Sequence, residues 1–463
     1  MARTVVASAA ASRVETLQEQ ARRHLWLHFS RMGGYLDGID IPIITRGDGC
    51  YVWDEHGNRY LDGMSGLACV NIGHGRHDVA QAGADQAREL AYYSNWSFAH
   101  PPAIELATRI ASLAPGDLNR VFFTSSGSEA VETAIKLAHQ FHRLRGNASK
   151  HKLIARRGSY HGTTLGALSA TGITPIRETF DPLLRSACHV SNTNTYRLSA
   201  EAQQNDFAEE IARRIEFEGP DTVSAVILEP VQNVGGCLTP PDGYFARVRE
   251  ICDTYDVVFI SDDVICAWGR LGEYFGAQRY DYAPDIITTA KGLTSAYAPM
   301  GAAIASDRIA EPFLEGKRVF LHGATYGGHP VACAVALANL DVIDQEHVIE
   351  NVRANELRLR DTLESLADIE IVGDVRGAGY LCAIELVKNR EAKQRFTRDE
   401  IEEHIRGFIG QQLFERGLIA RVDDRGDPVI LLAPPLIAGP EQFDEIEKVL
   451  RSTLQDASKR IQT

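Results

Sequence analysis

Apolar residues change their spacing about a hundred residues into the chain. From about residue 103 to 340, short apolar runs alternate with segments in which apolar side chains recur every three or four positions. The first pattern is typical of strands buried on both faces of a parallel sheet, and the second of helices that cover such a sheet. This part is therefore predicted to form an α/β domain. Strands are predicted at 120–124, 151–157, 224–230, 257–263 and 285–290, and helices at 129–145 and 244–255.

The segments on either side follow other patterns. Residues 14–26 have helical spacing, and residues 50–63 read as a hairpin with "HGN" at its turn. After about residue 340 come a helix, strands within 369–387, a second helix and the apolar run 429–437, which is typical of a smaller α+β unit. We therefore expect a segment over 1–75 that contributes to the small domain, a large domain over 76–335, and a C-terminal small domain over 336–463.

Composition and charge narrow the class of protein. The chain has 463 residues and a formal charge of −14, which argues against nucleic acid or an anionic membrane as a main partner. No apolar run approaches the length needed to cross a bilayer. The eight cysteines are scattered without a CxxC pair, which favours reduced thiols in a cytoplasmic protein. We read "MARTVVASAAAS" as a frayed terminus, with a targeting peptide as the alternative.

Polar residues follow each predicted strand of the α/β domain. In open α/β sheets, ligands bind at the carboxyl ends of the strands, so these residues are expected to meet at one edge. Any one of them is a weak signal, but five together predict one site. In strand order they are Ser125–Glu129, Gly158–Gly162, Glu229 with Gln232, Asp262 with Asp263, and Lys291.

Each of these residues also has a purely structural interpretation. Ser126 and Glu129 have the spacing of a capping box, although a helix start of this kind also suits a phosphate. Asp262 could pair with Arg270 or with a cationic cofactor atom, because a buried carboxylate needs a partner. Lys291 could be a surface lysine at a strand end. No P-loop, HExxH, GxSxG or metal-ligand spacing is present.

Taken together, the residues meet the needs of pyridoxal 5′-phosphate chemistry. That chemistry requires a lysine that forms an imine, an aspartate for a ring N–H⁺, a phosphate-binding site and an aromatic side chain to stack on a ring. The order and combination of motifs resemble the class III, ω-type, pyridoxal-phosphate aminotransferases of fold type I, from about residue 30 to 440. The motifs that carry the resemblance are "LDGMSGLACVNIGHG", "FTSSGSEAVETAIKLA", "SYHGTTLGALSATG", "ILEPVQNVGG", "ISDDVICAWGRLG", "TTAKGLTSAYAPMGA", "HGATYGGHPVACAVALANL" and "ILLAPPLI".

The resemblance implies a large domain with a mostly parallel central sheet, a smaller α+β domain, and defined roles around the cofactor ring. Lys291 would be the Schiff-base lysine and would shuttle the proton. Asp262 would keep the ring nitrogen protonated. Val264 would pack on one ring face and Tyr160 would stack on the other, while Gln232 would lie near the phenolic oxygen.

The resemblance also implies a shared site in a homodimer. Gly127 and Ser128 would bind the cofactor phosphate. Thr325, in "GATYGGHP", would reach the same phosphate from the neighbouring subunit, so a complete site would need two chains. Whether two dimers join into a tetramer stays open at this stage.

On the substrate side, the resemblance makes Glu229 and Arg421 a switching pair. Arg421 would bind a substrate carboxylate or turn aside for an uncharged group; the alternative is a solvated loop arginine in "RVDDRGDP", a stretch slightly longer than usual. Phe29, Ala68 and Trp96 would line the substrate pocket. Many relatives have tryptophan at the position of Ala68, so the pocket is expected to be larger here unless Trp96 or Trp26 fills the space. The family usually has glutamate for Asp263 and phenylalanine for Trp268.

The function that follows is a ping-pong aminotransferase. It would take an amino group from an amine or ω-amino acid and pass it to a keto acid, with pyruvate as the expected acceptor. The donor stays open among compounds like β-alanine, taurine and putrescine. The alternatives are a decarboxylase, racemase or aminomutase with the same cofactor, or a non-catalytic protein on the same fold.

Overall fold

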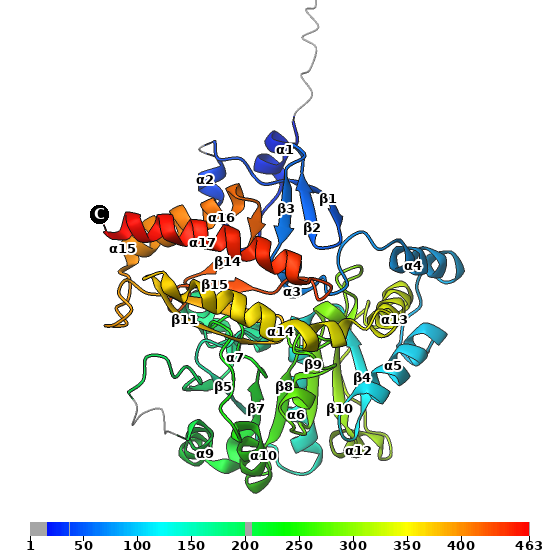
Figure 1. The fold of residues 1–463 in the computed structure, drawn as a ribbon. Helices are drawn as coiled ribbons and strands as arrows, with labels where there is room; N and C mark the ends of the chain where they lie inside the picture. The colour runs from blue at the N-terminus through cyan, green and yellow to red at the C-terminus, as the bar shows by residue number, and fades with distance from the viewer. Residues whose placement is uncertain (1–15, 37, 200–205, 463) are drawn as a thin grey trace, which may run out of the picture. The chain divides into compact units, whose positions relative to one another are not determined.

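The computed structural model describes residues 16–36, 38–199 and 206–462 (Figure 1). The chain forms two compact units. The smaller unit comprises Met1–Arg46 and Trp53–Arg59, and the larger comprises Gly47–Val52 and Tyr60–Thr463. The three predicted segments, 1–75, 76–335 and 336–463, have boundaries that differ from those of these two units. That division of the chain stays a prediction.

In the N-terminal region, the predicted helix and hairpin are both present. Helix α1 (Leu17–His24) begins at a capping box, in which Thr16 and Glu19 each bind the backbone N–H of the other. Asp54 forms the turn of the hairpin, because its Oδ1 accepts from the N–H groups of His56 (2.9 Å) and Asn58 (2.8 Å). The other elements here are α2 (Met32–Leu36), β1 (Ile44–Asp48), β2 (Tyr51–Asp54), β3 (Arg59–Asp62) and α3 (Ser65–Ala68).

A seven-stranded sheet forms the centre of the larger unit, in the order β4-β10-β9-β8-β7-β5-β6. β10 runs antiparallel to both of its neighbours, and the other adjacent strands are parallel. All five strands predicted in this domain are confirmed, whereas β6 and β10 were not predicted. The strands are β4 (Leu118–Thr124), β5 (Lys152–Arg156), β6 (Ala187–Val190), β7 (Val223–Leu228), β8 (Val258–Asp262), β9 (Ile286–Thr289) and β10 (Gly301–Ser306).

Side chains from both faces of this sheet are buried, which explains the continuous apolar runs. Ile227 of β7 packs in the core on the side of α6, whereas Val226 and Leu228 pack in the core that includes α10. The helices around the sheet are α4 (His77–Glu89), α5 (Pro101–Leu113), α6 (Gly127–Leu144), α7 (Leu165–Ala170), α8 (Thr174–Arg177), α9 (Phe207–Glu218), α10 (Tyr244–Thr254), α11 (Gly276–Arg279), α12 (Asp307–Leu314) and α13 (Pro330–Gln345).

The C-terminal part is the predicted smaller α+β arrangement. An antiparallel sheet has the order β11-β12-β15-β14, and α14 and α17 pack against each other beside it (Figure 1). A π-helix, Ile401–Gly410, contacts β14. The elements are α14 (Val348–Glu364), β11 (Val372–Ala378), β12 (Leu381–Leu386), α15 (Arg398–Glu400), α16 (Gln411–Glu415), β13 (Leu418–Ile419), β14 (Arg421–Asp423), β15 (Val429–Leu432) and α17 (Pro440–Gln462).

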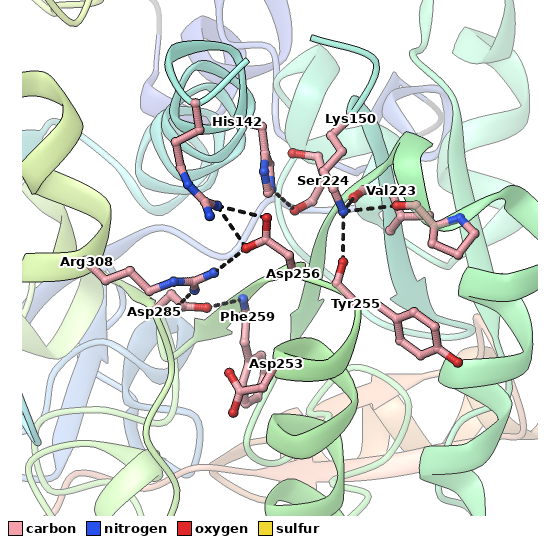
Figure 2. A network of polar contacts seen from close by, with 12 residues as sticks. His142, Lys150, Val223, Ser224, Asp253, Tyr255, Asp256, Phe259, Asp285 and Arg308 are labelled. Atoms are coloured by element: carbon pink, nitrogen blue, oxygen red, sulfur yellow. Dashed lines mark hydrogen bonds and ion pairs between the residues drawn. The ribbon is translucent and has the colours of Figure 1, made fainter. Parts of the chain in front are cut away.

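A buried polar network holds the amino ends of β7, β8 and β9 together (Figure 2). The ammonium of Lys150 donates to three backbone carbonyls, including those of Val223 (3.3 Å) and Tyr255 (2.9 Å). Asp285 accepts from the N–H of Phe259 at 2.7 Å. Because these contacts fix one end of the strands, the opposite, carboxyl ends are held at one edge of the sheet.

Two further predictions concern thiols and membranes. All eight cysteines are free, and six of them are buried, as expected for scattered reduced thiols. Across the described ranges, no helix has both the length and the apolar character needed to cross a membrane.

Candidate active site

A cavity of about 470 Å³ lies at the carboxyl edge of the seven-stranded sheet. Residues that lie at the ends of five different strands line it, so the structure brings together most of the polar residues that were expected to share one site; Gln232 and Asp263 do not line it. These residues are Ser125–Ser128 after β4, Tyr160 after β5, Glu229 after β7, Asp262 and Val264 at the end of β8, and Lys291 after β9.

Asp262 is buried at the end of β8 and has three hydrogen-bond partners. Its Oδ2 lies 2.6 Å from Nδ1 of His161. Its Oδ1 accepts from the Thr288 hydroxyl at 3.0 Å and from the Val264 N–H at 3.2 Å. These contacts hold the carboxylate in one orientation. His161 was not predicted as a partner of Asp262; the only local signal was its place beside Tyr160 after β5.

The suggested pair of Asp262 with Arg270 is wrong. Arg270 is fully buried and donates instead to the Tyr380 carbonyl (3.1 Å), the Asn71 Oδ1 (2.9 Å) and the Ser65 hydroxyl (3.0 Å). By donating to these neutral acceptors, the Arg270 guanidinium holds loops of the larger unit together. Asp262 is therefore not the partner of Arg270.

Lys291 is half-buried and starts the turn that follows β9, with a φ of 43°. Its Nζ donates to the Leu67 carbonyl at 2.5 Å and lies 3.8 Å from the Cys69 sulfur. Burial lowers the pKa of Lys291, although Cys69 acts in the opposite direction. A lowered pKa increases the fraction of neutral amine, which is the nucleophilic form of lysine. This side chain is therefore not a solvated surface lysine.

The start of α6 forms another wall of the cavity. Ser126 caps the helix by accepting from the Glu129 N–H at 3.2 Å, and Glu129 accepts from the Ser125 N–H at 2.7 Å. A Cβ on Gly127 would lie 2.7 Å from Cγ1 of Val264, so only glycine lets these two segments come this close. The N–H groups of a first helical turn have no intrahelical acceptor, which makes this wall suitable for an anion.

Glu229 lines the cavity, and burial raises the pKa of its carboxyl group to about 7. Its Oε1 is 3.5 Å from the Asn233 N–H, and Oε2 has no hydrogen-bond partner within the described ranges. Among the residues that the structure describes, no ion pair joins Glu229 to Arg421. The Nε of Arg421 lies 3.2 Å from Asp423 instead.

Arg421 nevertheless acts on the cavity through its charge. Burial raises the pKa of the Tyr160 phenol, and the positive charges of Arg425 and Arg421 oppose that rise. The charge of Arg421 also contributes to the lowered pKa of Lys291. Arg421 thus lies within electrostatic reach of the cavity, and it is not an isolated, solvated loop arginine.

Two residues expected at the cavity lie behind its wall. Gln232 is fully buried, and its Nε2 donates to the Arg157 carbonyl at 2.9 Å. Ala68 is buried in a core cluster that includes Met64 and Val231, while its neighbours Leu67 and Cys69 line the cavity. The side chain of Ala68 therefore does not set the width of this cavity directly.

Trp96 and Thr325, which were also expected at the site, are not among the residues that line this cavity. Trp96 is exposed and packs against Gly323, 3.1 Å from the position of a Cβ there. Thr325 is exposed, and its carbonyl accepts from the Tyr92 hydroxyl at 2.6 Å. Phe29 belongs to the smaller unit, and its side chain is exposed.

Comparison with known proteins gives consistent results. The sequence profile of the family "Aminotransferase class-III" matches residues 38–454. A probable aminotransferase of Mycobacterium tuberculosis is 54% identical over 96% of this chain and 95% of its own. The putrescine–pyruvate aminotransferase of Pseudomonas aeruginosa is 40% identical, covering 90% of this chain and 91% of its own.

Solved structures agree with the sequence comparisons. The ω-transaminase from Pseudomonas jessenii in complex with PMP has a TM-score of 0.91 and is 32% identical, covering 96% of this chain and 99% of that one. The fold is thus that of the class III transaminases, and the predicted fold class is confirmed. The chain belongs to the class III aminotransferase family, and it is an aminotransferase.

Proposed function

We propose that this protein is an ω-aminotransferase that uses pyridoxal 5′-phosphate and passes an amino group from an amine or ω-amino acid to pyruvate. The observation that carries the proposal is the meeting of Lys291, Asp262 and the start of α6 in one cavity. The relative that is named for putrescine and pyruvate supports both the donor class and the acceptor.

The residues of the cavity fit the proposed cofactor. When bound, pyridoxal 5′-phosphate supplies an aldehyde that condenses with amines and a protonated ring that accepts electrons. Asp262, held by His161, would stabilise the proton on the ring nitrogen. The first turn of α6 would hold the phosphate, and Tyr160 and Val264 would contact the two faces of the ring.

Lys291 would act as both nucleophile and proton carrier in this site. Its lowered pKa leaves more of the side chain as a free amine, which can bind an aldehyde and accept a proton from the substrate. Its hydrogen bond to the Leu67 carbonyl is to a neutral acceptor, so Lys291 can leave that contact without stranding a buried charge.

We further propose that the protein is a homodimer with shared active sites, and that it works in the cytoplasm. Large apolar side chains are exposed on two segments that pack together within one chain, among them Trp96 (63% exposed) and Leu321 (87% exposed). A surface of this kind is typical of a subunit interface. Thr325 lies on the same surface, where it would reach a partner's phosphate site. The free cysteines support a reducing compartment.

The test is to load the protein with the cofactor and offer it a panel of amines, one at a time. Absorbance should show conversion to the aminated form with ω-amino acids or diamines, and pyruvate should reverse the conversion and yield alanine. Release of CO₂ or racemisation without any alanine would instead support a decarboxylase or a racemase.

A further inference from the structure

Three charged side chains meet at the end of β14: Arg421, Asp423 and Arg425. Asp423 is buried, with only 2% of its side chain exposed. Arg425 binds it closely, with Nε at 2.9 Å from Oδ1 and 3.1 Å from Oδ2, and with Nη2 in contact with Oδ2. The shortest approach of Arg421 to the same carboxylate is from Nε, at 3.2 Å. The two arginines therefore share one counter-ion unequally.

The unequal sharing leaves part of Arg421 available. A guanidinium has five N–H donors and can bind a carboxylate through its two terminal nitrogens. Asp423 lies nearest to Nε of Arg421 and is, within the described ranges, the one carboxylate at ion-pair distance from it. Arg421 can thus bind a substrate carboxylate while it stays beside Asp423.

The turn that carries this cluster is held on both sides. Asp424 forms two contacts of 2.6 Å with Arg406 of the π-helix. Asp427 binds Arg395 at 2.6 Å and Arg197 at 3.0 Å. Asp423 and Arg425 are therefore fixed in place before any substrate arrives, rather than brought together by it.

The charges of the cluster act on Tyr160, which lines the cavity. Burial raises the pKa of the Tyr160 phenol, and the positive charges of Arg425 and Arg421 oppose this rise. Burial would raise the pKa of Asp423, but Arg425 and Arg421 hold it below the usual range, so Asp423 stays charged. Glu229, whose pKa burial raises to about 7, is partly neutral near that pH and is a weaker counter-ion.

We propose that Asp423 is the resting counter-ion of Arg421, and that Arg425 limits how tightly Asp423 holds it. This cluster, which is distinct from the Glu229–Arg421 pair, would let one cavity accept partners with and without a carboxylate. The inference rests on the proposed function, because it takes Arg421 as the carboxylate-binding residue. An uncharged amine would leave Arg421 paired with Asp423, and a carboxylate would neutralise the net single positive charge of the cluster.

Two substitutions should move carboxylate binding in opposite directions. Asp423→Asn raises the net charge of the cluster to two, so the dissociation constant for pyruvate should fall about tenfold, as expected for one charge at a partly buried site. The reaction with an uncharged amine such as 1-phenylethylamine should slow about tenfold, because Arg421 loses its partner. Arg425→Gln leaves Asp423 to Arg421 alone, so pyruvate should bind about tenfold more weakly.

The experiment measures both half-reactions of the holoenzyme by absorbance, for each variant and for the double variant. The double variant has the wild-type net charge, so its pyruvate affinity should return towards the wild-type value. Asp444→Asn is the matched control: it also removes one carboxylate that pairs with an arginine, but it lies on α17 and pairs with Arg358, so it should not change the ratio of the two half-reactions.

Each outcome has a clear meaning. Opposite shifts in pyruvate affinity, with recovery in the double variant, would support the inference. Losses of similar size for pyruvate and the uncharged amine in both single variants would overturn it and make the cluster structural. A wild-type enzyme that reacts with amines but not with pyruvate or any other keto acid would overturn the proposed function, and this inference with it.

Discussion

Oδ2 of Asp262 lies 2.6 Å from Nδ1 of His161, although 101 residues separate the two in the chain. A hydrogen bond of this length to a carboxylate fixes the orientation of the carboxylate. His161 itself lines the cavity, and through this hydrogen bond it also positions Asp262.

We expect His161→Phe to keep the cofactor but lower kcat/KM by roughly 10- to 150-fold. The loss corresponds to about 1.5–3 kcal/mol for a hydrogen bond to a charged group. His161→Asn, which retains a polar donor, should recover part of the activity. The measurement is steady-state kinetics, and the absorbance of the bound cofactor is recorded in parallel. The absorbance shows whether a loss of activity is caused by loss of the cofactor. Equal activity of the two variants would mean that the hydrogen bond is unimportant.

The shared-site prediction concerns Thr325. Thr325→Ala should weaken cofactor retention, because a phosphate oxygen loses a hydroxyl donor worth about 1.5–3 kcal/mol if the bond is charge-assisted. When Thr325→Ala is mixed with Lys291→Ala, heterodimers should have one site with both changes and one with neither, so activity should reappear. If subunit exchange is demonstrated and no activity returns, Thr325 does not act across an interface.

For Arg421, the prediction separates charged from uncharged partners. Arg421→Ala should slow the pyruvate and alanine half-reactions by roughly 10- to 150-fold in kcat/KM, because a bidentate pair worth about 1.5–3 kcal/mol is lost. The reaction with 1-phenylethylamine, if it is a substrate, should change much less. Arg358→Ala, which removes an exposed arginine of α14 that pairs with Asp444, is the control. Equal losses for both partners would make Arg421 structural.

Glu229 should make stability depend on pH. Its pKa is about 7 in the folded chain, compared with 4.5 as the ordinary value, so the folded state holds this proton more tightly than the unfolded state. The stabilisation is complete below about pH 4.5, and up to about 3 kcal/mol is lost as the pH rises through 7.

Glu229→Gln imitates the protonated form and should remove this dependence. Urea unfolding of wild type and variant at pH 5 and pH 8, at one protein concentration, measures the difference. Asp263, whose pKa is also raised to about 7 by burial, is present in both proteins, so its contribution cancels. Parallel pH profiles would show that Glu229 ionises normally in the folded chain.

Much of the fold could be predicted from local apolar patterns. The buried strands β7 and β8 are continuous apolar runs, and the polar residues after them mark the carboxyl edge. β10 was missed because Gly301–Ser306 is mostly glycine, alanine and serine, which give little strand signal alone. Its place between β4 and β9 depends on pairing that the local sequence does not encode.

Only those site residues that lie at the ends of recognisable strands could be predicted from the sequence. Lys291 and Asp262 each follow a recognisable strand, so the topology alone brings them to one edge. The side chain of Gln232 turns away to the Arg157 carbonyl, because its direction depends on the loop after β7 and not on its spacing from Glu229. The sharing of Asp423 by two arginines likewise depends on how the turn after β14 folds back.

The most direct test of the account is to reduce the cofactor-loaded protein with borohydride and map the attachment site by mass spectrometry. The account predicts a yellow protein whose cofactor becomes fixed to the peptide that contains Lys291, while Lys291→Ala binds the cofactor reversibly and does not turn over. Attachment at another lysine, or no attachment at all, would contradict the assignment of Lys291 and of the cavity around it.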